Sequence, residues 1–214
     1  MKISIICSDP THPINKYLLQ WIDKRSHDHQ IELIRKKSEL TEGSILFLVS
    51  CGEILTESDR ASYGVSLVLH ASDLPRGRGW SPHIWELADG ATSITLSLIE
   101  AQDKVDSGNI WKKIHIAVPV TYLWDEINHL LFMAELELMD FALKSYGNVD
   151  SQPQSTVGAT YFRLRTQEDS RIDVDKTISA QFDLIRICDP IRFPAFFEYR
   201  GQKYALKLEK LNDE

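Results

Sequence analysis

Apolar runs alternate along the first half of the chain with segments of helical spacing. Apolar residues between Ile14 and Ile22 recur at three- and four-residue steps, which predicts a helix there. The short, mostly apolar runs read as strands: Ile3–Cys7, Gln30–Ile34, Ser44–Val49 and Val65–Leu69. Strands with no polar face, alternating with helices, are typical of a parallel sheet covered on both sides. The pattern therefore predicts an α/β, Rossmann-like fold with a mainly parallel sheet.

The second half of the chain contains one long amphipathic segment and then a change of composition. Leu123–Tyr146 carries apolar residues at helical spacing and ends before Gly147, a usual helix terminator. Residues 147–158 are rich in Ser, Gln and Pro. We therefore expect a catalytic domain at 1–150 and a small C-terminal α+β extension at 151–214, packed on the core. The further elements predicted are helices at Thr56–Tyr63, Pro82–Asp89 and Lys176–Cys188, a strand at Ile94–Ile99, and a hairpin of Phe196–Tyr199 with Lys203–Leu208.

Composition narrows the class of protein. A hydrophobic content of 43% with 26% charged residues is that of an ordinary globular domain, and no apolar run is long enough to span a bilayer. The first residues read as a strand, not as a signal peptide. The three cysteines are widely spaced and form no Cys-x-x-Cys motif, which favours reduced thiols in a cytoplasmic protein and no metal site.

The charge and the first strand-to-helix turn argue against two kinds of ligand. A net charge of −7 disfavours a nucleic-acid partner, because phosphate contacts need a basic surface. The first predicted strand is followed by Ser8-Asp9-Pro10-Thr11, without the glycine-rich fingerprint of dinucleotide-binding proteins. Binding of NAD or FAD at this turn is therefore not expected.

Candidate chemistry begins where the fourth predicted strand ends, at His70. Ligands of open parallel sheets bind outside the carboxyl ends of the strands, and an imidazole there can act as a general base because its ordinary pKa lies near neutrality. The segment from His70 to Pro82, HASDLPRGRGWSP, resembles the signature of the N10-formyltetrahydrofolate-dependent formyltransferases. A later block, Val105-Asp106-Ser107-Gly108-Asn109-Ile110, is similar to the second motif of that family.

The resemblance implies a Rossmann-like formyltransferase core and a reaction in which an amine attacks the formyl carbon of N10-formyltetrahydrofolate. His70 would move the amine proton and Asp106 would orient the imidazole. The family has an asparagine two residues before the histidine, which stabilises the oxyanion, but this chain has Val68. Ser50, Asn109 or a backbone amide could replace that donor, or activity could be lost. Asn109 itself stands where the family has an aspartate.

The resemblance also implies which residues bind the two substrates. We expect the folate to be held by Ser72, Leu74, Pro75, Arg78, Gly79, Gly52, Ile54 and Leu55. We expect the acceptor to be bound by Arg76, Arg186 and Phe196.

Three acceptor hypotheses remain open at this point. The acidic chain and short tail favour a nucleotide-linked 4-amino-4,6-dideoxy sugar, UDP-linked and of the pseudaminic-acid type. The alternatives are a methionyl-tRNA formyltransferase-like enzyme and a catalytically impaired homologue that still binds folate or nucleotide. A small-molecule nucleotide-sugar partner, no membrane partner and a homodimer are expected with the first hypothesis.

Overall fold

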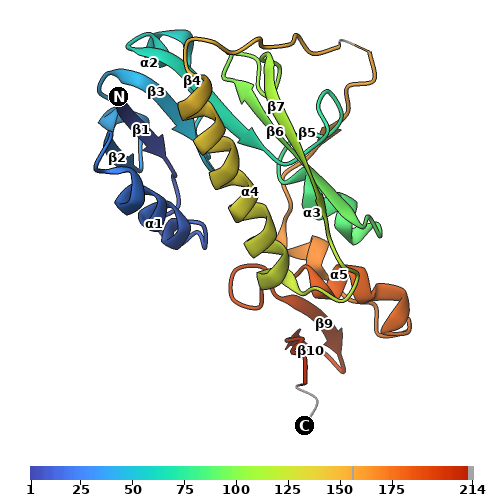
Figure 1. The fold of residues 1–214 in the computed structure, drawn as a ribbon. Helices are drawn as coiled ribbons and strands as arrows, with labels where there is room; N and C mark the ends of the chain where they lie inside the picture. Colours follow the sequence, from blue (N-terminus) through green and yellow to red (C-terminus); the bar gives the residue numbers. More distant parts are fainter. Residues whose placement is uncertain (156, 212–214) are drawn as a thin grey trace.

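A six-stranded sheet forms the centre of the computed structural model, which describes residues 1–155 and 157–211 (Figure 1). Its strand order is β2-β1-β3-β4-β6-β7. The parallel strands are β1 (Lys2–Ile6), β2 (Gln30–Ile34), β3 (Gly43–Leu48) and β4 (Tyr63–His70). Two antiparallel strands complete the sheet, β6 (Ser93–Glu100) and β7 (Ile110–Ala117). The expected Rossmann-like architecture with a mainly parallel sheet is confirmed.

Strand β7 was not among the predicted strands. β7 is an edge strand and is partly exposed to solvent. Lys112, Lys113 and His115 interrupt its apolar pattern. An apolar run therefore does not reveal it. Pairing with β6 along its length is what defines it as a strand.

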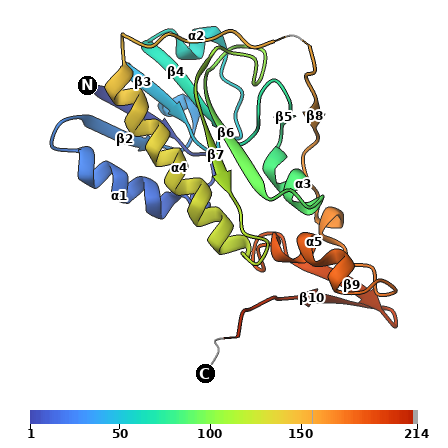
Figure 2. The same cartoon turned by 45° about the vertical axis from the view of Figure 1, so that its right-hand side comes forward.

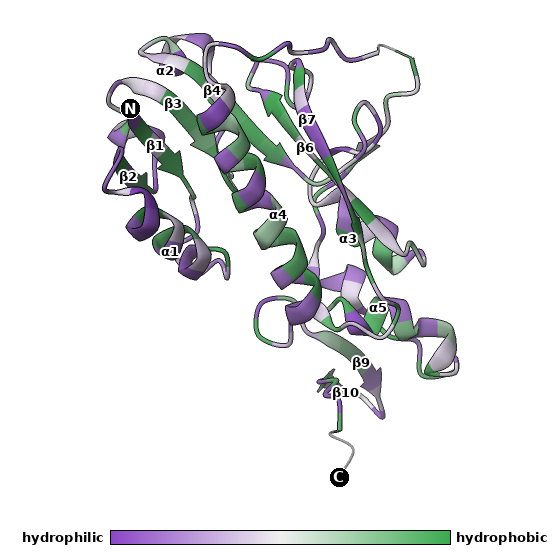
Figure 3. Cartoon of the chain, viewed as in Figure 1, coloured by the Kyte–Doolittle hydropathy of each residue, from purple (hydrophilic) through white to green (hydrophobic). Residues whose placement is uncertain are grey.

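Two helices, α1 (Asn15–Arg25) and α4 (Trp124–Ser145), lie on the same face of the sheet and bury the larger core (Figure 1). Figure 3 shows the apolar strands β1 and β3 beneath them. Asp140 on α4 ties the helices together, accepting hydrogen bonds from Trp21 Nε1 at 2.8 Å and Arg25 Nη2 at 2.7 Å. A smaller apolar cluster covers the other face: Ile6, Ile34, Leu46, Leu48, Leu55 and Tyr63.

The short helices α2 (Glu57–Arg60) and α3 (Pro82–Ala88) follow β3 and the His70 loop. The predicted helix at Thr56–Tyr63 is too long, because Tyr63 already pairs with β3 as the first residue of β4. Thr56 does cap the helix as expected: its hydroxyl accepts from the amide of Asp59. Single 3-10 turns occur at Lys37–Glu39 and Gln167–Ser170.

The C-terminal segment runs from the end of α4 back along the sheet and ends in a hairpin (Figure 2). Its helix is shorter than the predicted Lys176–Cys188, comprising a 3-10 turn at Ser179–Gln181 and α5 (Phe182–Arg186). The predicted hairpin is present as β9 (Ala195–Tyr199) and β10 (Gln202–Leu206). Residues 156 and 212–214 of the expected extension lie outside the described residues.

The carboxyl ends of β1, β3 and β4 point toward the part of the molecule where α3 and α5 lie (Figure 1). Within residues 1–155 and 157–211, no helix is long and apolar enough to cross a membrane.

Candidate active site

His70 is the last residue of β4, and the alternation of side chains along that strand determines on which face of the sheet it lies. Leu67 and Leu69 pack into the core beneath α4, so His70 lies on the opposite face at the strand end. Its side chain is buried, with Nε2 2.8 Å from the carbonyl oxygen of Gly77. A carbonyl can only accept, so Nε2 carries the proton of the neutral ring. Nδ1 is therefore the proton-accepting atom, and it lies 3.4 Å from Asp106 Oδ1.

Asp106 reaches His70 from the loop between β6 and β7. It is buried and has a φ of +54°, a conformation that aspartate adopts more readily than most residues. Its second carboxylate oxygen accepts a hydrogen bond from the amide of Gly79 at 2.8 Å. Gly108 lets this loop close, because a Cβ there would lie 1.8 Å from the carbonyl oxygen of Glu100. The two sequence motifs thus meet in space through His70, Asp106 and Gly79.

The loop after His70 is held by the C-terminal segment. β5 (Arg78–Gly79) pairs in parallel with β8 (Tyr161–Phe162). A Cβ on Gly79 would lie 2.2 Å from the carbonyl oxygen of Phe162, so this close pairing requires glycine. Gln154 completes the contact. It accepts from Arg78 Nη2 at 2.8 Å and donates to the carbonyl oxygens of Asp106 and Gly108.

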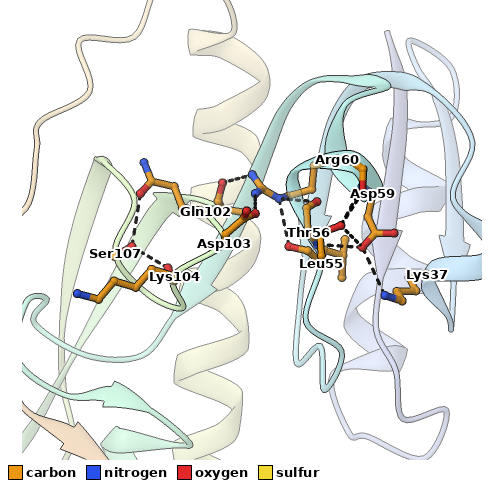
Figure 4. Close-up of polar contacts among 11 residues, drawn as sticks. Lys37, Leu55, Thr56, Asp59, Arg60, Gln102, Asp103, Lys104 and Ser107 are labelled. Atoms are coloured by element: carbon orange, nitrogen blue, oxygen red, sulfur yellow. Dashed lines mark hydrogen bonds and ion pairs between the residues drawn. The ribbon is translucent and has the colours of Figure 1, made fainter.

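Arg60 on α2 holds the other side of the Asp106 loop (Figure 4). Its Nε donates to the carbonyl oxygens of Leu55 and Thr56, and its two terminal nitrogens donate to Ala101 O and Asp103 Oδ1. The guanidinium is largely buried, with 14% of the side chain exposed. Because Leu55 and Ala101 both line the cavity described next, Arg60 joins two segments of its wall.

A cavity of about 550 Å³ opens beside His70 and Asp106. That volume is within the range of small-molecule binding sites. One part of the lining comes from the ends of β3 and β4 and from the segments after β3, β4 and β6, and it includes the apolar side chains Leu48, Leu55, Val68, Trp80, Ala101 and Val105. The other part comes from the loop after β1, from α4 and from the C-terminal segment, and it includes Asp9, His12, Asn128, Glu135, Arg165, Asp189, Arg192 and Phe193. We call these the apolar end and the polar end.

The predicted site residues divide into two groups in the structure. Those that line the cavity are His70, Asp106, Gly79, Gly52, Ile54 and Leu55. Those that do not line it are Ser72, Leu74, Pro75, Arg76, Arg78, Arg186 and Phe196. Val68 lines the cavity, and its side chain offers no hydrogen-bond donor. Of the groups expected to replace that donor, Ser50 also lines the cavity, whereas the Asn109 side chain donates to Ser151 Oγ at 3.5 Å.

The predicted acceptor-binding residues lie away from the cavity for identifiable reasons. Arg186 is fully buried, donating to Asp183 at 2.7 Å and to the carbonyl oxygen of Tyr122. Phe196 is buried in the C-terminal segment, with the Lys203 ammonium 4.3 Å from its ring centre. Arg76 is exposed.

Several cavity residues were missed by the sequence analysis. His12 follows β1, so the strand-end rule that identified His70 applies to it too. Glu135 is an ionisable residue on the apolar face of α4, and such a residue in an apolar row is itself a sequence sign of a site. His83, Arg165 and Arg192 carried no sequence pattern that pointed to a site.

The titratable groups of the cavity are strongly affected by burial. Burial lowers the pKa of His12 to about 4 and that of His83 to about 3, so both rings are neutral near pH 7. Burial raises the pKa of Glu135 to about 8. It also raises the pKa of Cys7 to about 11, with Glu135 among the smaller contributions. Within the described residues, no group of three or more His, Cys, Asp or Glu side chains could hold a metal ion.

Comparisons with known proteins show what this fold is. No protein-family model matches the sequence. A methionyl-tRNA formyltransferase from Clostridium thermocellum shares 22% identity at a TM-score of 0.82, covering 99% of this chain and 94% of that one. A sugar N-formyltransferase from Shewanella sp FDAARGOS_354 shares 14% identity at 0.75, covering 100% and 99%.

A third similar structure is HypX from Aquifex aeolicus in complex with tetrahydrofolic acid, with 17% identity and a TM-score of 0.76. The match covers 95% of this chain and 36% of that larger one. The chain therefore has the Rossmann-like fold of the formyltransferases. The fold expected from the two sequence motifs is confirmed.

Proposed function

We propose that this protein transfers a formyl group from N10-formyltetrahydrofolate to the amine of a nucleotide-linked 4-amino-4,6-dideoxy sugar. The observation that carries the proposal is the buried contact of His70 with Asp106 beside a cavity that has an apolar and a polar end. We take residues 1–150 as the catalytic domain and 151–214 as its small extension.

The folate fits the apolar end. Leu48, Leu55, Val68 and Trp80 offer flat apolar contacts for a pteridine ring. There is also room for a ring beside Gly52, because the nearest atom to a Cβ at this position would be in Trp80, at 4.0 Å. A solved structure of the same fold holds tetrahydrofolic acid, which supports a folate donor.

The folate supplies an activated formyl carbon. In the transfer, a bond forms between the acceptor nitrogen and that carbon, the bond from the carbon to N10 breaks, and one amine proton ends on N10. His70 Nδ1 accepts the proton from the amine and returns it to N10. The Asp106 carboxylate, 3.4 Å away, stabilises the imidazolium between these two steps.

The acceptor fits the polar end. Arg165 and Arg192 line it and carry positive charge for a diphosphate, while Phe193 offers a face for a base. Arg192 is held by Asp9 at 2.6 Å, so its guanidinium is already positioned. The similarity to a sugar N-formyltransferase over the full length of both chains supports a sugar acceptor. We propose a UDP carrier and a pseudaminic-acid type of sugar in a cytoplasmic reaction.

A methionyl-tRNA acceptor is the second candidate, because a methionyl-tRNA formyltransferase has the higher TM-score and identity of the compared structures. The net charge of −7 argues against it. The third hypothesis, an impaired binding protein, rests on Val68.

A formylation assay separates these hypotheses. The protein is incubated with N10-formyltetrahydrofolate and a panel of UDP- and dTDP-linked 4-amino sugars, or with methionyl-tRNA, and products are identified by mass. Asp106→Asn is the informative variant because asparagine tolerates the left-handed backbone. We expect His70→Ala and Asp106→Asn to lose activity by at least about a hundredfold, while exposed His27→Ala is unaffected. Transfer to tRNA alone, or to no acceptor, would contradict the proposal.

A further inference from the structure

Glu135 is the most unusual side chain of the cavity. It lies on the buried face of α4 with only 6% of its surface exposed. Its Oε2 atom is buried without a hydrogen-bond partner, and neither carboxylate oxygen takes part in an ion pair among residues 1–155 and 157–211. The side chain also lines the polar end of the cavity.

Packing does not account for a carboxyl group at this position. Burying an ionisable group without a partner lowers the free energy of unfolding by several kcal/mol. A leucine or methionine of similar volume carries no such penalty. The neighbouring positions on the same face are apolar, including Leu131, Ala134 and Leu138. A carboxyl group in this row is therefore explained better by a ligand than by the fold.

The cations of the polar end do not neutralise it. Arg192 is paired with Asp9, and Arg165 donates to Ser170 Oγ at 3.1 Å and to the carbonyl oxygen of Asp169. His12 packs edge-on against Phe132, one turn before Glu135, and burial keeps its ring neutral near pH 7. Glu135 therefore has no cationic partner among residues 1–155 and 157–211.

We propose that Glu135 binds the amine of the acceptor in its ammonium form as the acceptor enters the cavity, and thereby selects amines over hydroxyl-bearing analogues. This inference rests on the proposed formyl transfer, whose acceptor is an amine. Amines of this kind are protonated in neutral water. Burial raises the pKa of Glu135 without a ligand, and the arriving ammonium group lowers it again, so that the carboxyl releases its proton and pairs as a carboxylate. Glu135 is an acceptor-binding residue: the ammonium group releases one proton to water before it attacks, and His70 takes the second proton that the nitrogen loses when the amide forms.

The test compares Glu135→Gln with Glu137→Gln, an exposed glutamate two residues further along α4. Steady-state kinetics are measured with the 4-amino sugar nucleotide that the wild type formylates. We expect Glu135→Gln to raise KM for this acceptor roughly 10- to 100-fold, which corresponds to the free energy of one charge-assisted hydrogen bond. KM for the folate donor is expected to stay unchanged. Glu137→Gln is expected to leave both constants unchanged.

A hydroxyl analogue distinguishes binding from a structural role. The matching 4-hydroxy sugar nucleotide is used as a competitive inhibitor, and its inhibition constant is expected to be the same in the wild type and in Glu135→Gln. An equal loss for amine and hydroxyl ligands, or an unchanged acceptor KM, would overturn the role of Glu135 while formyl transfer stands. Absence of transfer by the wild type overturns both.

Folding of the variants is followed by thermal denaturation, with Glu135→Met as a second variant of similar volume. Both substitutions remove a buried ionisable group, so both variants are expected to fold. Failure of both to fold would assign Glu135 to the structure of the core and would overturn the inference.

Discussion

At the scale of single residues, the site depends on groups whose burial changes their chemistry. His70 places Nδ1 near Asp106 because Nε2–H donates a hydrogen bond to the Gly77 carbonyl oxygen. Glu135 is held in an environment that favours its neutral form. Both properties lead to measurable consequences.

Glu135 should make stability depend on pH. Burial raises its pKa from 4.5 to about 8, so between these values the folded chain holds a proton that the unfolded chain releases. Raising the pH through this window therefore favours unfolding, by up to about 1.4 kcal/mol per pH unit. Denaturant unfolding should be measured between pH 5 and pH 8. The free energy of unfolding of Glu135→Gln minus that of the wild type should increase as the pH rises. The lowered pKa values of His12 and His83 are common to both proteins and cancel in that difference.

A constant difference across the pH range would contradict the buried, unpaired state of Glu135. Glu137→Gln serves as the control, because its exposed carboxylate should give no such trend.

Val68 is the second residue with a direct test. It lines the cavity two residues before His70 and can donate no hydrogen bond. Removing one oxyanion donor from an enzyme typically costs on the order of a hundredfold in rate. In single-turnover experiments, we expect Val68→Asn to raise the rate constant of formylation several-fold. Val68→Ala adds no donor and should not raise it. A fall in kcat for both variants would show that another group, such as Ser50, already fills this role.

At the scale of elements, the contact between His70 and Asp106 is assembled from two loops. The loop after β4 carries His70, the loop between β6 and β7 carries Asp106, and the Gly79 amide joins them at 2.8 Å. Arg60 on α2 holds the second loop through Ala101 and Asp103. The short helix α2 therefore positions this loop through Arg60, although none of its residues is fully buried.

Replacing Arg60 should weaken folate binding more than it weakens folding. Arg60→Met removes the donors that link Leu55 to Ala101, so the apolar end of the cavity should widen. We expect KM for the folate donor to rise roughly tenfold, with partial rescue in Arg60→Lys, because small displacements of binding groups are costly. Lys37→Met is the control, since the Lys37 side chain forms an exposed ion pair with Asp59 (Figure 4), and the hydrogen bond from its backbone amide to Glu53 is kept in the variant. Equal effects of the two methionine variants would argue against this role.

At the scale of the whole molecule, the C-terminal segment is part of the site. It returns along the sheet to pair β8 with β5, and it contributes Arg165, Arg192 and Phe193 to the cavity (Figure 2). Gln154 bridges Arg78 to the carbonyl oxygens of Asp106 and Gly108. Residues far apart in the sequence thus hold the His70 and Asp106 loops in one geometry.

This long-range support predicts an effect at Gln154, which does not line the cavity. Gln154→Ala should lower kcat at least about tenfold, because the Asp106 loop loses two hydrogen bonds and a misplaced catalytic group is costly. Gln152→Ala is the matched control: its ladder contacts with Ile110 are made by the backbone and remain. Rates for purified, folded variants check the prediction, and full activity in Gln154→Ala would contradict it.

The sequence by itself determined the mainly parallel sheet, the long helix of Leu123–Tyr146, the C-terminal hairpin and the prediction that His70 and Asp106 act together. Apolar periodicity and motif order are local properties, so they can be read without coordinates. Only the tertiary structure decided that Arg186 and Phe196 are buried away from the cavity and that His12, Glu135 and Arg192 line it. Burial and neighbourhood depend on contacts between distant segments, and the same arginine can be a ligand-binding group or an internal ion pair according to those contacts.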